Sequence, residues 1–177
     1  GDASALEVYK VLLTHTLNVS LAVDLSRHLF YDEFIPEKDM WPHQKFNKNL
    51  QVRGDLGDRM KAAFRLALSN QKSAIIIGSD CPEISPDIIK NAINALQNKD
   101  IVIGPTLDGG YYLLGMKKCH DFLFEDIDWS TEKVFSQTCE KAESNALSVT
   151  VVEKLSDLDN IDDLNNFPHI KSQIIGL

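Results

Sequence analysis

The chain has 177 residues, of which 44% are hydrophobic and 25% charged, a composition typical of folded globular proteins and not of disordered or fibrous ones. This length supports one substantial hydrophobic core, so we expect a single domain over residues 1–177. The formal net charge of −8 argues against binding to DNA or RNA, and no apolar stretch is long enough to span a membrane.

The N-terminal part of the chain gives one clear pattern and two weaker ones. Between Ala5 and Thr16, apolar residues recur at helical spacing and predict an amphipathic helix. The residues from 19 to 24 follow the two-residue period of a half-buried strand. From Ser26 to Asn49 no period persists and two prolines interrupt the segment, so we expect irregular structure there.

The remainder of the chain alternates between strand and helix patterns. A β-branched run that ends before Gly78 is typical of a strand covered on both faces, and Ser85 followed by Pro86 is a strong helix start. The patterns predict helices at 60–68, 85–96 and 134–142, and strands at 74–77, 101–103, 111–114 and 149–152. Such alternation implies a mainly parallel sheet, in which 75–77 and 101–103 are neighbouring parallel strands.

Three cysteines, Cys81, Cys119 and Cys139, are an odd number and lack the spacing of a zinc finger or a CxxC motif. A disulfide framework or a structural zinc site therefore has little support. The sequence also lacks a secretory signal pattern. We expect a reduced, cytoplasmic protein.

An acidic motif follows the strand predicted at 74–77. Gly78, Ser79 and Asp80 lie where the strand ends, and ligands of open parallel sheets bind at such carboxyl edges. Glycine allows close approach of a ligand to the backbone, and a carboxylate oxygen suits Mg²⁺ or Mn²⁺. The alternative is that Asp80 caps the next helix, but Ser85 is already available as that cap. We therefore favour a metal-binding role for Asp80.

A second acidic loop follows the strand predicted at 101–103. Asp108 is followed by Gly109 and Gly110, and two adjacent glycines suggest a strained turn or a place where a ligand lies against the main chain. Taken alone, the segment is also compatible with an ordinary hairpin turn. Its position beside the Asp80 loop favours a shared ligand site.

Five motifs in order carry a resemblance to a known family. They are QVRGDLGDRM at 51–60, IIIGSDCP at 75–82, IGPTLDGGYYLLGM at 103–116, DIDWST at 126–131 and SDLDNIDDL at 156–164. With them the chain resembles, from residue 1 to about 165, bacterial GT-A-like glycosyltransferases of the radical-SAM/selenodomain-associated type, in the nucleotide-diphospho-sugar transferase superfamily. The resemblance implies an α/β three-layer sandwich with a mainly parallel sheet.

The resemblance also implies roles for individual residues, in one cleft with a divalent metal, Mg²⁺ or Mn²⁺. The implied metal ligands are Asp80 and Asp159, the implied nucleotide-binding residues are Gly57, Asp58, Arg59, Gly78 and Ser79, and those facing sugar or acceptor are Gly109, Gly110, Tyr111 and Trp129. Asp108 or Asp128 would act as general base. Two structural alternatives stay open, a helix cap at Asp159 and a core position for Trp129.

The chain departs from this family at its start. Members begin with a strand and a loop bearing Lys-Thr-Arg that approaches the nucleotide phosphates, whereas this sequence starts directly in a helical pattern. We therefore expect the N-terminal strand to be absent. The favoured function is transfer of a sugar from a nucleotide-sugar to a small-molecule acceptor. The protein could act as a homodimer. The alternatives are nucleotidyl transfer from an NTP to a phosphorylated small molecule, and nucleotide binding without catalysis.

Overall fold

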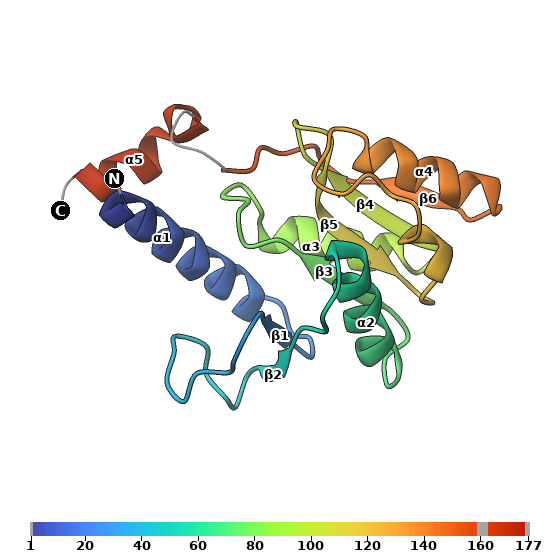
Figure 1. The fold of residues 1–177 in the computed structure, drawn as a ribbon, viewed down its shortest axis with the longest axis horizontal. Coiled ribbons are helices and arrows are strands. Elements are labelled where there is room, and N and C mark those ends of the chain that lie inside the picture. Colours follow the sequence, from blue (N-terminus) through green and yellow to red (C-terminus); the bar gives the residue numbers. More distant parts are fainter. Residues whose placement is uncertain (1, 159–162, 176–177) are drawn as a thin grey trace.

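The computed structural model describes residues 2–158 and 163–175 and contains helices around two separate β-sheets (Figure 1). The helices are α1 (Asp2–Leu21), α2 (Leu56–Leu68), α3 (Pro86–Ala95), α4 (Val134–Ser144) and α5 (Pro168–Ile175), with short 3₁₀ helices η1 (Asp121–Leu123) and η2 (Asp163–Asn166). The strands are β1 (His28–Tyr31), β2 (Asn47–Leu50), β3 (Ala74–Ile77), β4 (Ile101–Pro105), β5 (Tyr111–Met116) and β6 (Val149–Val151). None of the helices in these two ranges is long and apolar enough to cross a membrane.

The larger sheet has the strand order β3-β5-β4-β6. β4 and β6 are parallel, whereas β5 is antiparallel to both β3 and β4, so three of the four strands run in the same direction. The prediction that 75–77 and 101–103 are direct neighbours is wrong, because β5 lies between them. Only a short turn joins β4 to β5, and short connections favour antiparallel pairing with the preceding strand.

Helices cover both faces of the larger sheet. On one face, α3 packs through Ile88, Ile89 and Ala92. On the other face, α2 packs through Met60 and Phe64, and α4 joins the same core cluster. The helix–sheet–helix arrangement is the α/β three-layer sandwich expected from the sequence. Every residue of β4 is buried, so the strand ends that carry the predicted loops are held by the core itself.

Two helix starts follow from capping side chains. Ser85 Oγ accepts a hydrogen bond from Ile88 N at 3.3 Å, and Pro86 opens α3, which confirms the helix start read from the sequence. At the start of α2, Asp55 Oδ1 accepts from Asp58 N at 2.8 Å. Each cap satisfies a backbone donor that has no partner inside its helix.

The strand predicted at 19–24 is wrong, since α1 continues to Leu21. Val19, inside α1, and Val23, just beyond its end, are both buried, whereas Leu21 between them is exposed, so the three do not share one face as they would in a strand. Residues four apart share a face in a helix as well as in a strand. The short apolar pattern was therefore compatible with a strand and with a helix, and the chain forms a helix up to Leu21.

The segment from Ser26 to Asn49 is more regular than expected. β1 and β2 pair in parallel as a small second sheet. Asp39 in the connecting loop accepts hydrogen bonds from the Tyr31 hydroxyl and, at 2.7 Å, from Lys48 Nζ. Both strands have only four residues and no clear alternation, so a search for periodicity could not detect them.

Asp100, which precedes β4, provides a test of electrostatic stabilisation. It accepts hydrogen bonds from Ser148 Oγ at 2.6 Å and Ser148 N at 2.9 Å, and these bonds hold its pKa below the usual value. When the pKa of a carboxyl group is lower in the folded than in the unfolded state, the charged group stabilises the fold at any pH above the unfolded pKa. This stabilisation is lost as the pH falls through the folded pKa. Asp100→Asn should therefore lower the free energy of unfolding by about 1 kcal/mol at pH 7, after allowance for solvent exposure.

The measurement is urea unfolding of both proteins at pH 7 and pH 3. The difference between them should shrink at pH 3, because the stabilisation is lost as the pH falls below the ordinary pKa of an aspartate and towards the lowered pKa of the folded carboxylate. Asp87→Asn is the control, because the Asp87 side chain is 84% exposed and its one partner among the described residues is Lys90, one turn along α3. A difference that stayed constant with pH would show that the charge of Asp100 is not the cause.

Candidate functional site

The candidate site lies at the edge of the larger sheet where β3 and β4 end and β5 begins. The two ending strands run in the same direction, so their following loops leave the same edge. Gly78 N donates a hydrogen bond to Tyr112 O at 2.9 Å and continues the pairing of β3 with β5 to this point. The Gly78–Asp80 loop and the 106–110 turn are therefore positioned by the core strands.

The segment after β6 connects the two loops. Leu155 N donates to Pro105 O at 3.1 Å, and Leu107 N donates to Leu155 O at 3.0 Å. Three residues further on, Leu158 N donates to Asp80 O at 2.9 Å. One extended stretch of chain thus runs along both loops. Asp159, the predicted second metal ligand, lies outside the described residues.

Asp80 has an exposed carboxylate at this edge. Its side chain is exposed, and within the described part of the chain its carboxylate makes no hydrogen bond or ion pair. Oδ1 lies over Gly78, where an added Cβ would be only 2.5 Å from it. The adjacent Cys81 is buried, its Sγ donates to Ser156 O, and burial raises the pKa of this thiol to about 11. The loop is thus anchored beside a carboxylate that points to solvent.

Asp108, in contrast, is engaged in its own turn. Its Oδ1 accepts hydrogen bonds from Thr106 Oγ1 and, at 3.0 Å, from Gly110 N. Side chains of Asp commonly stabilise turns in this way. Oδ2 has no such contact among the described residues, so one oxygen of the carboxylate remains open to solvent.

Gly109 allows two segments of main chain to approach each other. Its φ of +97° lies in the region that favours glycine, and an added Cβ would be 2.2 Å from Glu132 O. Phe135 N donates to Gly109 O at 2.9 Å. The glycine pair was predicted to mark a strained turn or a place where a ligand lies against the main chain, and the turn is strained at Gly109. In the structure, Gly109 admits the loop that precedes α4.

Gly57 and Trp129, predicted for nucleotide and substrate binding, lie in contact. An added Cβ on Gly57 would be 2.7 Å from Cζ2 and Nε1 of the indole. Trp129 is half-buried and packs against the same core cluster as α2. Tyr111 belongs to this cluster too, and its hydroxyl lies 4.0 Å from Met60 Sδ. Burial raises the pKa of Tyr111, so its hydroxyl stays protonated at neutral pH.

Arg59, predicted to bind nucleotide, joins α2 to the small sheet. Its Nη1 donates to Asp32 Oδ1 at 2.9 Å and to Gln51 Oε1 at 2.8 Å, and its Nε donates to Gly54 O. Asp32 follows β1 and Gln51 follows β2, so the guanidinium holds both strand ends against α2. The neighbouring Asp58 forms an ion pair of 3.2 Å with Lys61.

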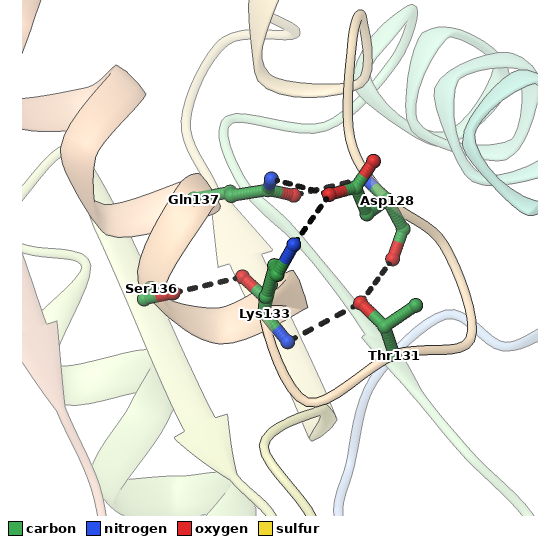
Figure 2. A network of polar contacts seen from close by, with 5 residues as sticks. All are labelled: Asp128, Thr131, Lys133, Ser136 and Gln137. Carbon is green, nitrogen blue, oxygen red and sulfur yellow. Dashed lines mark hydrogen bonds and ion pairs between the residues drawn. The ribbon is translucent and has the colours of Figure 1, made fainter.

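Asp128 belongs to a polar network at the start of α4, which Figure 2 shows. Its Oδ2 accepts from Gln137 Nε2 at 3.0 Å and lies 3.5 Å from Lys133 Nζ, and its N donates to Gln137 Oε1 at 2.8 Å. Thr131 Oγ1 donates to Asp128 O at 2.7 Å. The network fixes the loop that carries Trp129. Asp128 is therefore held in place, with one of its oxygens shared by an amide and an ammonium group.

Several residues that shape the site were missed by sequence reasoning. The buried Thr106 and the amide of Gln137 orient the two candidate bases. A threonine two residues before an Asp-Gly-Gly turn was a usable signal, because hydroxyls commonly stabilise turns. For Gln137 and for the segment after β6, no local pattern marked the partners, which are distant in sequence.

Two hollows are formed mainly by other parts of the chain. One, of about 350 Å³, is lined by residues of α1 together with Pro82 and Ile170, and the other, of about 310 Å³, by residues 25–27 and 43–47. Neither is lined by a predicted site residue. Across residues 2–158 and 163–175, no three His, Cys, Asp or Glu side chains are grouped to hold a metal by themselves.

Comparison with solved structures gives the same fold. A structure from Desulfovibrio desulfuricans G20, described as a "putative nucleotide-diphospho-sugar transferase", matches with a TM-score of 0.85 and 29% identity over 94% of this chain and 75% of that one. A CMP:2-keto-3-deoxy-manno-octonic acid synthetase complexed with CTP matches with a TM-score of 0.59 and 10% identity, over 92% of this chain and 88% of that one. The second likeness concerns the fold alone.

Sequence comparison identifies the family. No curated protein matches the chain. The bacterial family described as "Uncharacterized protein conserved in bacteria (DUF2064)" matches residues 15–131, which is more than half of the chain and includes both acidic loops and Trp129. The chain has the fold of nucleotide-diphospho-sugar transferases and belongs to the DUF2064 family.

Proposed function

We propose that the protein is a metal-dependent transferase that uses a nucleotide-sugar as donor. The observation that carries this proposal is the exposed carboxylate of Asp80, which has no hydrogen-bond or ion-pair partner among the described residues, at the edge of the sheet where β3 and β4 end. Ligands of α/β sheets bind at such edges. The likeness to the Desulfovibrio desulfuricans protein, at 29% identity, supports the same substrate class.

The residues of the site fit a metal that is shared with the substrate. Mg²⁺ in nucleotide sites is commonly held by one or two carboxylates together with substrate phosphates, so a dedicated cage of three side chains is not required. Asp80 would be such a ligand, and Asp159 stays a prediction for the second. When bound, the cation would neutralise charge on the departing diphosphate.

Nucleotide contacts are proposed for the two glycine-bearing segments of the site. Gly78 and Ser79 are placed beside Asp80, and Gly57 lies under the Trp129 indole at the first turn of α2. Arg59 and Asp58 would act mainly by holding this turn, because their charged groups already have partners in the protein. The sugar or acceptor would lie along Gly109, Gly110 and the exposed face of Trp129.

Two carboxylates are candidates for the general base that activates the acceptor hydroxyl. Oδ2 of Asp108 has no hydrogen-bond partner among the described residues, and Asp128 shares one oxygen with Gln137 and Lys133. Loss of a general base should lower kcat roughly 100- to 10,000-fold. Asn at either position keeps an oxygen that can accept the existing hydrogen bonds, so Asp108→Asn and Asp128→Asn test the charge with little change in shape.

The measurement is kcat as a function of pH for both variants, with nucleotide affinity measured separately. We expect the variant that lacks the general base to have a lower kcat and a pH profile without its acid limb. Its affinity for nucleotide should stay within a few-fold of wild type. A parallel fall in kcat and in the free energy of unfolding would instead assign the residue a structural role.

Product analysis tests the proposed reaction. The protein is incubated with Mn²⁺, a mixture of nucleotide-sugars or NTPs, and candidate acceptors, and the released nucleotide products are separated by chromatography. Release of a nucleoside diphosphate supports sugar transfer, whereas release of pyrophosphate from an NTP would replace it with nucleotidyl transfer. Tight binding of nucleotide without any turnover would contradict the enzyme proposal and indicate a binding domain.

A further inference from the structure

The smaller of the two hollows lies where β1 and β2 begin. It has a volume of about 310 Å³ and is lined by residues 25–27, just before β1, and 43–47, at and just before the start of β2. Small-molecule sites in proteins start at about this size. Because the two strands are parallel, the hollow lies at the end of the small sheet opposite to Asp32 and Gln51, which bind Arg59.

The charged residues of the hollow have one sign. Arg27, His43 and Lys45 line it, and no described residue of the lining is acidic. The protein as a whole has a formal net charge of −8, so such a lining is contrary to the average surface. A concave surface lined by basic groups alone attracts small anions.

Arg27 is held in place at the end of α1, which lies beside the small sheet in Figure 1. Its Nε donates to Ser20 O at 2.7 Å, and its Nη2 donates to Val23 O. The guanidinium carbon lies 5.9 Å from the centre of the Phe46 ring. Nη1 donates to no described residue. The charged group is therefore fixed before a ligand arrives and keeps donors for it, which lowers the entropy cost of binding.

His43 is oriented by a neighbouring ion pair that is mostly buried. The side chains of Lys48 and Asp39 are 4% and 14% exposed, with Nζ 2.7 Å from Oδ1. The same Nζ lies 3.3 Å from His43 Nε2. An ammonium group can only donate, so Nε2 accepts and Nδ1 of the neutral ring carries the proton. His43 thus offers one donor to a ligand, and the charge of Asp39 is already balanced by Lys48.

Three polar side chains of the lining are uncommitted. Ser26, Gln44 and Lys45 make no side-chain hydrogen bond or ion pair within the described part of the chain. Lys45 adds a second full positive charge to that of Arg27, and the hydroxyl and amide groups add neutral donors. Arginine and lysine together with neutral donors suit a phosphate group, which carries more charge and more acceptor oxygens than a carboxylate.

We propose that this hollow binds the phosphate group of a small phosphorylated molecule, at a site separate from the candidate transfer site. Arg27 and Lys45 neutralise the phosphate, and Ser26, His43 and Gln44 donate to its oxygens. The occupant is a small molecule and not a nucleic acid, because the net charge of −8 repels a polyanion over the rest of the surface.

The test is an NMR titration of the whole protein with inorganic phosphate and with glycerol 3-phosphate. EDTA is present, so that the candidate transfer site holds no cation and the outcome does not depend on the proposed transferase activity. The amide signals of residues 25–27 and 43–47 should shift and saturate, whereas those of residues 78–80 should not. Acetate at the same ionic strength should bind roughly tenfold more weakly, because it has fewer acceptor oxygens and less charge.

Lys45→Gln should weaken the binding of glycerol 3-phosphate by roughly tenfold, since a charge-assisted hydrogen bond is lost. Lys72→Gln is the matched control, because Lys72 is an exposed lysine in the loop before β3 and does not line the hollow. Arg27 is less suitable for substitution, since its loss would also remove the hydrogen bonds to the end of α1.

Three results would overturn the proposal. They are equal weakening by the two lysine substitutions, equal binding of acetate and phosphate, and the absence of saturable shifts at residues 25–27 and 43–47. A single-stranded oligonucleotide that bound more tightly than glycerol 3-phosphate through the same residues would also overturn it, in favour of a surface for polyanions.

Discussion

Asp80→Asn is expected to lower the affinity for a nucleoside diphosphate in the presence of Mn²⁺ by roughly 100-fold, equivalent to a loss of ~3 kcal/mol. The reason is electrostatic. A protein with a formal net charge of −8 repels a diphosphate, and a bound cation reverses the local charge. Asparagine keeps the shape of the side chain but removes the charge that holds the cation.

Calorimetric titration of wild type and variant, with and without EDTA, measures this effect. Wild type should lose affinity when the metal is chelated, and the variant should be weak in both conditions. Asp87→Asn is a matched control, since Asp87 is another exposed carboxylate of the same region, at the start of α3, and should leave binding unchanged. Equal, metal-independent affinity of wild type and Asp80→Asn would exclude Asp80 as the metal ligand and favour a non-catalytic domain.

Gly109→Ala is expected to destabilise the fold by about 3 kcal/mol. At a φ of +97° any side chain is strained, and the new Cβ would lie 2.2 Å from the backbone oxygen of Glu132. A backbone atom cannot rotate away as a side chain can, so the loop before α4 must move. The expected result is a lower midpoint in urea unfolding, with an m-value close to that of wild type.

Gly110→Ala provides the comparison for this prediction. An added Cβ there meets Thr106 Oγ1 at 3.0 Å, and the position has no positive φ. Its loss of stability should stay below about 1 kcal/mol, because a small shift of one side chain relieves the contact. Similar losses for the two variants would mean that the close approach to Glu132 does not limit stability.

Much of the fold could be predicted from local sequence. The apolar stripe that became α2, the β-branched run of β3 and the Ser85 cap each act within one element or its first turn. Their signals are periodicity and capping, which depend on residues close in sequence. The two acidic loops could be placed at strand ends for the same reason. The identity of the candidate ligands therefore followed from the sequence, together with the family resemblance.

The roles of these loop residues depended on partners far along the chain. Asp80 and Asp108 looked alike as acidic residues in glycine-bearing loops, but Asp108 is engaged in its turn, whereas the Asp80 carboxylate is exposed and has no partner in the part of the chain that the structure describes. Asp128 is held by Gln137, and Arg59 is held by Asp32 and Gln51. Which polar group has a partner is decided by tertiary contacts, and no local pattern reports it.

The sequence by itself determined which segments form α2, α3, α4 and the strands from β3 to β6, because apolar period and caps are local properties. Only the tertiary structure decided that β5 lies between β3 and β4 and that α1 continues through Val19. The short turn between β4 and β5 pairs these two strands as a hairpin, and the order of the other strands depends on which edges they pair with. The spacing of Val19 and Val23 fits a helix as well as a strand, and their burial in the core is a tertiary contact. Pairing and burial of this kind bring together segments that are distant in sequence, so they are determined by the tertiary structure and not by local sequence.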